Sequence, residues 1–145
     1  MASIPELALA KAMHLKLDLS VHRWMVPADS FHFQCLEPKP AMLDAFHRAR
    51  AENLPWVEEM PLPVLVYHEG RHEFRIMDGM MRICSAQQAQ IPEIPALVAS
   101  GETYDELEHI LNQGYYGEDF IEMLAMVNPI ISENLKLRDR NRSSI

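Results

Sequence analysis

A short stretch near the middle of the chain, Asp78-Gly79-Met80-Met81-Arg82, combines residue types that bind anions. A glycine between a strand and a helix lets a ligand approach the backbone closely, and the first N–H groups of a helix are unpaired at its positive end. Arg82, in the first helical turn, adds a guanidinium group that can hold phosphate with two hydrogen bonds. The stretch therefore predicts phosphate binding at Gly79, Met80, Met81 and Arg82. The alternative is a common turn with Arg82 as a solvated surface residue.

The elements that must position this stretch follow from hydrophobic periodicity and turn residues. The expected elements are a half-buried strand at 15–22, a helix at 40–52, a hairpin of strands at 62–68 and 72–77, a helix at 80–90 and a strand at 94–99. Pro40 suits the first position of its helix, and Glu69-Gly70 suits the hairpin turn. Together they predict an α+β fold, with a small mixed sheet that contains a hairpin and carries packed helices.

Helices are also expected on both sides of this core. Capping patterns predict helices at 4–14 and 104–112, and apolar spacing predicts two more at 118–127 and 130–137. The predicted organisation is a core with an N-terminal helix over 1–100, an acidic helical appendage of the same domain over 101–137, and a basic disordered tail over 138–145. No lysine or arginine lies between Arg82 and Lys136, in a chain of formal net charge −8.

The core resembles the ParB/sulfiredoxin-like superfamily. In that family a hairpin ends in an aspartate or asparagine and a glycine, and a helix with arginine and small residues leads to a strand containing Ile-Pro-Ala. The matching residues are Pro63-Val64-Leu65-Val66, Phe74-Arg75-Ile76, Asp78-Gly79, Arg82, Ser85-Ala86 and Ile94-Pro95-Ala96-Leu97-Val98. The resemblance covers about residues 15–100 and implies a nucleotide site at the glycine turn.

The resemblance implies a cofactor, ATP or CTP with Mg²⁺, and a regulatory role in a DNA-related, plasmid or phage process. The match is degenerate, because Met80 stands where sulfiredoxin has its catalytic cysteine and Met81 where ParB proteins have a second phosphate-binding arginine. A thioether cannot act as a thiolate nucleophile, so sulfinic acid reductase activity is not expected. Arg82 would be the one cationic fork left at the site.

Two other function classes remain open from the residues. The first is a small ATP-dependent enzyme of the same fold, an ATPase, a kinase or a nuclease, with Asp78 and Glu37 as catalytic residues; Glu37 matches the kinase branch only by region. The second is a catalytically inactive interaction or inhibitor protein, which docks a basic protein partner through its acidic 102–133 region.

Composition bounds the remaining expectations. The acidic net charge predicts weak or no direct DNA binding, and no apolar run or signal-peptide pattern suggests a membrane segment, so a cytoplasmic location is expected. Cys35 and Cys84 are expected to be core thiols rather than a disulfide. No metal site is expected, and the alternative is a metal ion bound by His68 and His72 at the hairpin turn. The oligomeric state stays open.

Two further groups of residues each allow two interpretations. Arg71 and Arg75 are expected to form a solvated ladder, with a phosphate cleft as the alternative. The aromatic residues Tyr115, Tyr116 and Phe120 are expected to form core under the last helices, with a contact surface or lid as the alternative.

Overall fold

A computed structural model describes residues 21–31, 35–68, 72–100 and, apart from 123 and 127, 121–143. The elements in chain order are β1 (His22–Pro27), the short 3₁₀ helix η1 (Ala28–Ser30), α2 (Pro40–Ala51), β2 (Val64–His68), β3 (Glu73–Asp78), α3 (Met80–Gln88), β4 (Glu93–Ser100) and α6 (Pro129–Ser143). Residues 121–122 and 124–126 are also helical. The predicted α+β class is confirmed.

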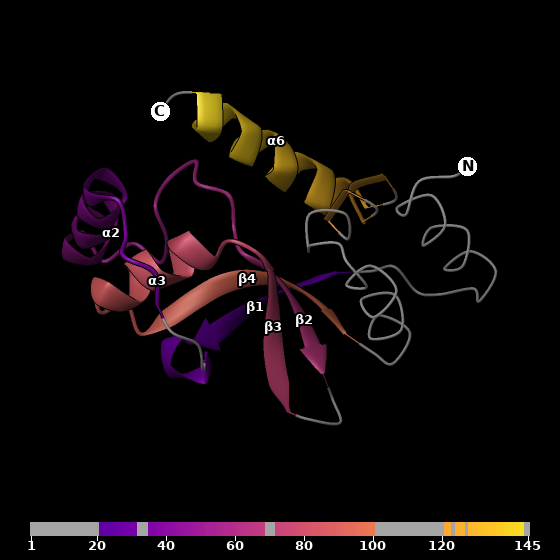
Figure 1. Ribbon diagram of the computed structural model, residues 1–145, viewed down its shortest axis with the longest axis horizontal. Helices are drawn as coiled ribbons and strands as arrows, with labels where there is room; N and C mark the ends of the chain where they lie inside the picture. Colours follow the sequence, from indigo (N-terminus) through magenta and orange to yellow (C-terminus); the bar gives the residue numbers. More distant parts are fainter. Residues whose placement is uncertain are drawn as a thin grey trace.

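The described strands form one mixed sheet in the order β1-β4-β2-β3 (Figure 1). β2 and β3 make the predicted hairpin, and β1 pairs antiparallel with β4. β4 returns parallel to β2, with Leu97 opposite Val64 and Val98 opposite Leu65. Since a parallel neighbour requires a crossover, the connection through β3 and α3 is what brings the glycine turn to the end of the sheet.

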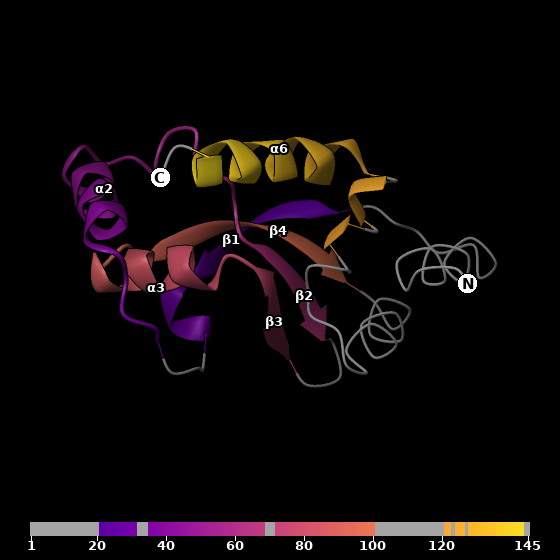
Figure 2. The ribbon, with the colours of Figure 1, turned by 45° about the horizontal axis from the view of Figure 1, so that its top comes forward.

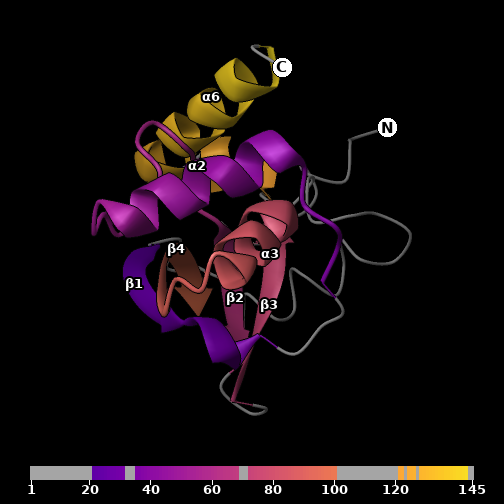
Figure 3. The same cartoon turned by 90° about the vertical axis from the view of Figure 1, so that its left-hand side faces the viewer.

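Alternate residues of the central strands feed two separate apolar cores. Leu65 and Val98 belong to a cluster with Phe46 of α2 and Ile83 of α3. The opposite face of the same strands packs against Ile121, Leu124 and Ile131, the last of which belongs to α6. Helices therefore cover both faces of the sheet, as the two-residue period of a strand buried on both sides requires. Figures 1 and 2 show α6 lying along the sheet apart from α2 and α3, and Figure 3 shows α2 and α3 side by side.

The junction between β3 and α3 depends on one glycine. Gly79 has φ +103°, which L side chains rarely adopt, and it is the N-cap of α3. A Cβ at this position would lie 3.0 Å from Pro63 Cα and 3.1 Å from the Arg82 guanidinium. The predicted strand–glycine–helix turn is thus present, and glycine is required there by both its dihedral angle and its surroundings.

Helix α6 differs from its prediction. It begins at Pro129, one residue before the expected start, and continues to Ser143, whereas a disordered tail was expected from 138. The physical reason is a set of contacts that fix the helix along its length. Asn134 hydrogen-bonds the backbone of Leu62, Arg138 is buried, and the Asn141 amide donates to the Glu59 carbonyl at 3.3 Å. The prediction of a disordered tail was therefore wrong up to residue 143.

Several other expectations meet the structure only in part. The predicted strand at 15–22 lies outside the described residues except for 21 and 22, and β1 instead takes in His22–Pro27, part of which was expected to be loop. The helix at 40–52 and the strand at 94–99 are confirmed within one residue. The predicted helices at 4–14 and 104–112 lie outside the described residues.

Candidate functional site

A pocket of about 370 Å³, the Gly79 pocket, opens at the glycine turn. It is formed by the first turn of α3, the start of α2, the loop before β2 and the last turns of α6. Its lining residues are Lys39, Met42, Met60, Pro61, Asp78, Gly79, Met80, Met81, Arg82, Arg138 and Asn141. All four of the predicted binding residues, Gly79 to Arg82, therefore lie at one pocket, together with Asp78. Its volume is within the range of small-ligand sites.

Two helix N-termini border this pocket. Gly79 caps α3 without a side-chain hydrogen bond, and Lys39 caps α2 likewise. The initial N–H groups of a helix have no intrahelical acceptor and carry the positive end of its dipole. Residues of both first turns line the same cavity, with the first N–H groups of α3 lacking a side-chain cap and Pro40 at the first position of α2 contributing no N–H group. The spacing around Gly79 alone did not reveal that the two helix starts meet there.

Arg82 is buried and holds the chain together beneath the pocket. Its guanidinium donates to the carbonyl of Pro61 at 2.6 Å and of Leu62 at 3.2 Å, and it lies 3.0 Å from the Asp78 carboxylate. Both readings of Arg82 as an open phosphate fork or a solvated side chain therefore need correction. Since two loop carbonyls and a carboxylate depend on it, Arg82 is a structural residue whose remaining surface borders the cavity.

A second arginine reaches the same carboxylate from α6. Arg138 Nη1 lies 3.8 Å from Asp78 Oδ1, and its side chain is buried. On the sequence alone Arg82 is the one cationic fork of the site, because Met81 stands where the resemblance has a second arginine. The basic residues at the end of the chain are visible in the sequence, but the prediction of a disordered tail included Arg138 and did not connect it with Asp78. Asp78, predicted as a catalytic residue, is thus clamped between two guanidinium groups.

The charge of the pocket is opposite to that of the chain. Among its lining residues Lys39, Arg82 and Arg138 are cationic and Asp78 is the one acid, in a chain of formal net charge −8. Lys39, two residues after Glu37, is exposed at the rim and was not singled out from the sequence. Because the arginines are already committed to Asp78 and backbone carbonyls, Lys39 is the cation best placed to meet a bound anion.

Methionines make up the apolar part of the lining. Met80 is 38% exposed and Met81 is partly buried, so the two do not simply fill core volume. Met42 of α2 and Met60 of the loop between α2 and β2 also line the pocket. Thioether side chains are flexible and polarizable and adapt to the shape of a planar apolar ligand. The methionines that break the family pattern at the helix start thus belong to a methionine wall built from three segments.

Glu37, the second predicted catalytic residue, is exposed and does not line the Gly79 pocket. The structure therefore does not bring Glu37 and Asp78 together at this cavity. Arg75 is exposed on β3 and is also not part of its lining, in agreement with a solvated position. The other predicted residues of this kind, Arg71, Tyr115, Tyr116 and Phe120, lie outside the described residues.

The remaining alternatives concern metals, partners and membranes. Within the described residues no group of three or more His, Cys, Asp or Glu side chains could hold a metal ion. The His72 ring lies 3.3 Å from the Tyr67 hydroxyl. Of the acidic 102–133 region, the described Glu122 and Glu133 are exposed. No helix in the described part of the chain is long and apolar enough to cross a membrane.

The two cysteines do not share one environment. Cys84, on α3, is buried as expected, but Cys35 is exposed, so the prediction of two core thiols is wrong for Cys35. The pKa of the Cys84 thiol is raised from 9.0 to about 11, chiefly by burial and in part by a hydrogen bond with the Cys35 side chain. Neither cysteine lines the Gly79 pocket, which leaves that cavity without a thiol nucleophile.

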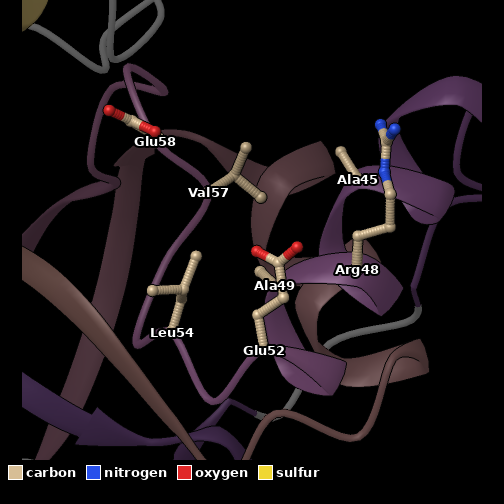
Figure 4. Close-up of a pocket in the computed structure, with 7 residues that line it drawn as sticks. All are labelled: Ala45, Arg48, Ala49, Glu52, Leu54, Val57 and Glu58. Carbon is tan, nitrogen blue, oxygen red and sulfur yellow. The ribbon is translucent and has the colours of Figure 1, made fainter.

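Two other pockets are less suited to binding an anion. One, of about 330 Å³, lies between α2 and the loop that follows it (Figure 4), and its charged lining consists of Arg48, Glu52 and Glu58. Its excess of carboxylates disfavours an anion. A wider hollow of about 650 Å³ contains Arg50, which already donates to Gln90 Oε1 at 2.9 Å. Of these pockets, the Gly79 pocket has the greatest excess of cations.

No protein-family model matches this chain, and no curated protein or solved structure matches it either.

Proposed function

We propose that the Gly79 pocket binds a nucleotide, ATP or CTP with Mg²⁺, and that the chain is a ParB/sulfiredoxin-like regulatory protein of a DNA-related, plasmid or phage process. One observation carries the binding part: two helix N-termini and three cationic side chains border a single cavity in an acidic chain. The nucleotide class and the biological setting come from the resemblance of residues 15–100 to that superfamily.

The lining divides naturally between the two parts of a nucleotide. The N–H groups at the start of α3 and the ammonium group of Lys39 would receive the phosphates, since helix starts and cations favour negative charge. Met42, Met60, Met80 and Met81 would contact the base or ribose as an adaptable apolar surface. In this arrangement Arg82 and Arg138 support the positive potential while holding Asp78.

Binding without chemistry is favoured over catalysis at this site. Asp78 is engaged by two arginines, one at 3.0 Å and the other at 3.8 Å, and Glu37 lies away from the cavity lining. A general base needs a lone pair aimed at its substrate, whereas each oxygen of the Asp78 carboxylate faces a guanidinium group, Oδ2 facing Arg82 and Oδ1 facing Arg138. The kinase or nuclease alternative therefore has no assembled pair of carboxylates among the described residues of the pocket.

Isothermal titration calorimetry with ATP and with CTP, each with Mg²⁺, tests the proposal. Lys39→Ala should weaken nucleotide binding about tenfold, the effect expected for one charge-assisted contact. Lys136→Ala is the matched control, because it removes the same charge from an exposed residue that does not line the pocket. It should leave the affinity unchanged.

Two results would contradict the proposal. Absence of binding heat with both nucleotides at millimolar protein and ligand would reject nucleotide binding. Equal weakening by Lys39→Ala and Lys136→Ala would show that overall charge, and not the Gly79 pocket, governs the interaction.

A further inference from the structure

Two cysteines from distant parts of the chain meet beside α3. Cys84 is fully buried within α3, and Cys35 lies in the segment that leads into α2. The Cys35 thiol donates a hydrogen bond to Gln87 Oε1 at 2.8 Å, which places its sulfur over the helix face that also carries Cys84, one turn earlier. A side-chain hydrogen bond with Cys35 and a backbone hydrogen bond with Leu36 both influence the pKa of the Cys84 thiol, in agreement with a position of residues 35–36 against this turn of α3.

We propose that Cys35 and Cys84 form a redox-active dithiol that low-molecular-weight disulfides convert to an intramolecular disulfide. The geometry supplies what the reaction needs, namely an exposed thiol for attack and a second thiol within hydrogen-bond reach of it on the neighbouring turn of α3. The chain contains only these two cysteines, so no other pairing within one molecule competes.

The order of events follows from exposure. Cys35, as its thiolate, attacks one sulfur of the oxidant, forms a mixed disulfide and releases one low-molecular-weight thiolate. Cys84 then attacks the Cys35 sulfur, and its proton passes to the departing sulfur, which leaves as the second low-molecular-weight thiol. In total two protein thiols become one protein disulfide, and two electrons and two protons pass to the oxidant, which leaves as two thiols. Because Cys35 is exposed and Cys84 is buried, Cys35 is the first nucleophile and Cys84 the resolving thiol, and the raised pKa of the Cys84 thiol agrees with this order.

The bond would join two walls of the Gly79 pocket. Cys35 lies four residues before Lys39, and α3 carries Gly79 at its start. Oxidation would therefore fix the segment that leads into α2 against α3, whatever ligand the pocket takes. Because Cys35 is exposed, an external thiol can reach the disulfide and reverse the reaction.

The test uses the full-length, reduced protein and oxidised glutathione as the probe. After incubation, free thiols are blocked by alkylation, and the intact mass and the disulfide-linked peptides are measured. The expected product is a monomer that has lost two hydrogen atoms, takes up no alkylating agent and contains a peptide pair joining Cys35 to Cys84. Its Tm should rise on the order of ten degrees, because the crosslink restricts a long loop in the unfolded chain, and dithiothreitol should restore the original Tm.

Single substitutions separate the roles of the two thiols. Cys84→Ala should stop at a glutathione mixed disulfide on Cys35, whereas Cys35→Ser should remain unmodified because Cys84 is buried. Cys35→Ser changes an exposed residue, so it stays folded even if a change at Cys84 does not. The proposal is overturned if the wild type stops at the mixed disulfide, forms only disulfide-linked dimers, or forms the internal disulfide only in denaturant.

Discussion

The guanidinium group of Arg82 lies 3.0 Å from the Asp78 carboxylate, and this ion pair spans the Gly79 turn that separates β3 from α3. The same guanidinium binds the carbonyls of Pro61 and Leu62, which belong to the loop before β2. One side chain thus joins the hairpin, the helix start and the entering loop. Arg82 therefore both supplies positive charge at the Gly79 pocket and stabilises the fold around it.

Arg82→Ala should lower the free energy of unfolding by about 3–5 kcal/mol, because it leaves the Pro61 carbonyl without its donor and the mostly buried Asp78 carboxylate with only the more distant Arg138. Chemical denaturation measures the change. Lys136→Ala, which removes an exposed pair with Glu133 at 3.2 Å, is the control and should change it by less than about 1 kcal/mol. Similar small losses for both variants would show that Arg82 is solvated in solution.

Gly79→Ala should destabilise the protein by about 1–3 kcal/mol, since the methyl group meets Pro63 at 3.0 Å in a backbone conformation with φ +103°. Glu59→Gly is a matched comparison in the opposite direction, because Glu59 has φ +61° with a side chain present. Its thermal unfolding midpoint should stay level or rise. Equal destabilisation by the two changes would argue against the left-handed turn at Gly79.

Asn134→Ala should cost about 2–4 kcal/mol. The Asn134 side-chain oxygen accepts from Leu62 N at 2.7 Å, and its NH₂ group donates to Leu62 O at 2.8 Å. The substitution therefore leaves the Leu62 N–H without its acceptor and removes the shorter of two hydrogen bonds to Leu62 O, which Arg82 also binds at 3.2 Å. Amide hydrogen exchange of Leu62 reads out this contact directly and should lose its protection. Ser132→Ala, on the same helix, should leave that amide protected; if Leu62 exchanges slowly in Asn134→Ala as well, the helix does not dock through this contact.

Alkaline pH should destabilise the reduced protein through Cys84. Its pKa is raised from 9.0 to about 11 in the folded chain, so the unfolded chain releases this proton first. The contribution of this thiol is fully present below pH 9.0 and is lost as the pH rises through 11, by on the order of 2 kcal/mol. Cys84→Ala removes the titrating group, and the difference between wild type and variant against pH is the measurement. A constant difference would place the thiol in solvent.

The sequence determined the elements that depend on local pattern. The alternation of apolar and polar residues predicted the hairpin of β2 and β3. Proline and the spacing of apolar residues predicted α2, and Asp78-Gly79 indicated the turn into α3. These features depend on φ preferences and on periods of two or 3.6 residues, which neighbouring residues carry by themselves. The membership of Met80 and Met81 in a binding surface was a hypothesis that followed from the same local pattern.

Only the tertiary structure decided which distant groups meet. The carbonyls that hold Arg82 lie about twenty positions earlier, and Arg138 approaches Asp78 from the last helix. Cys35, in the segment that leads into α2, lies against the face of α3 that carries Cys84. Periodicity reports which face of an element is buried but not which element covers it, because burial is a non-directional effect of water exclusion. The contacts of the charged side chains and of the two cysteines are instead fixed by how the helices dock on the two faces of the sheet. Because of that docking, Arg82, which was expected to be open to a ligand, is a structural residue.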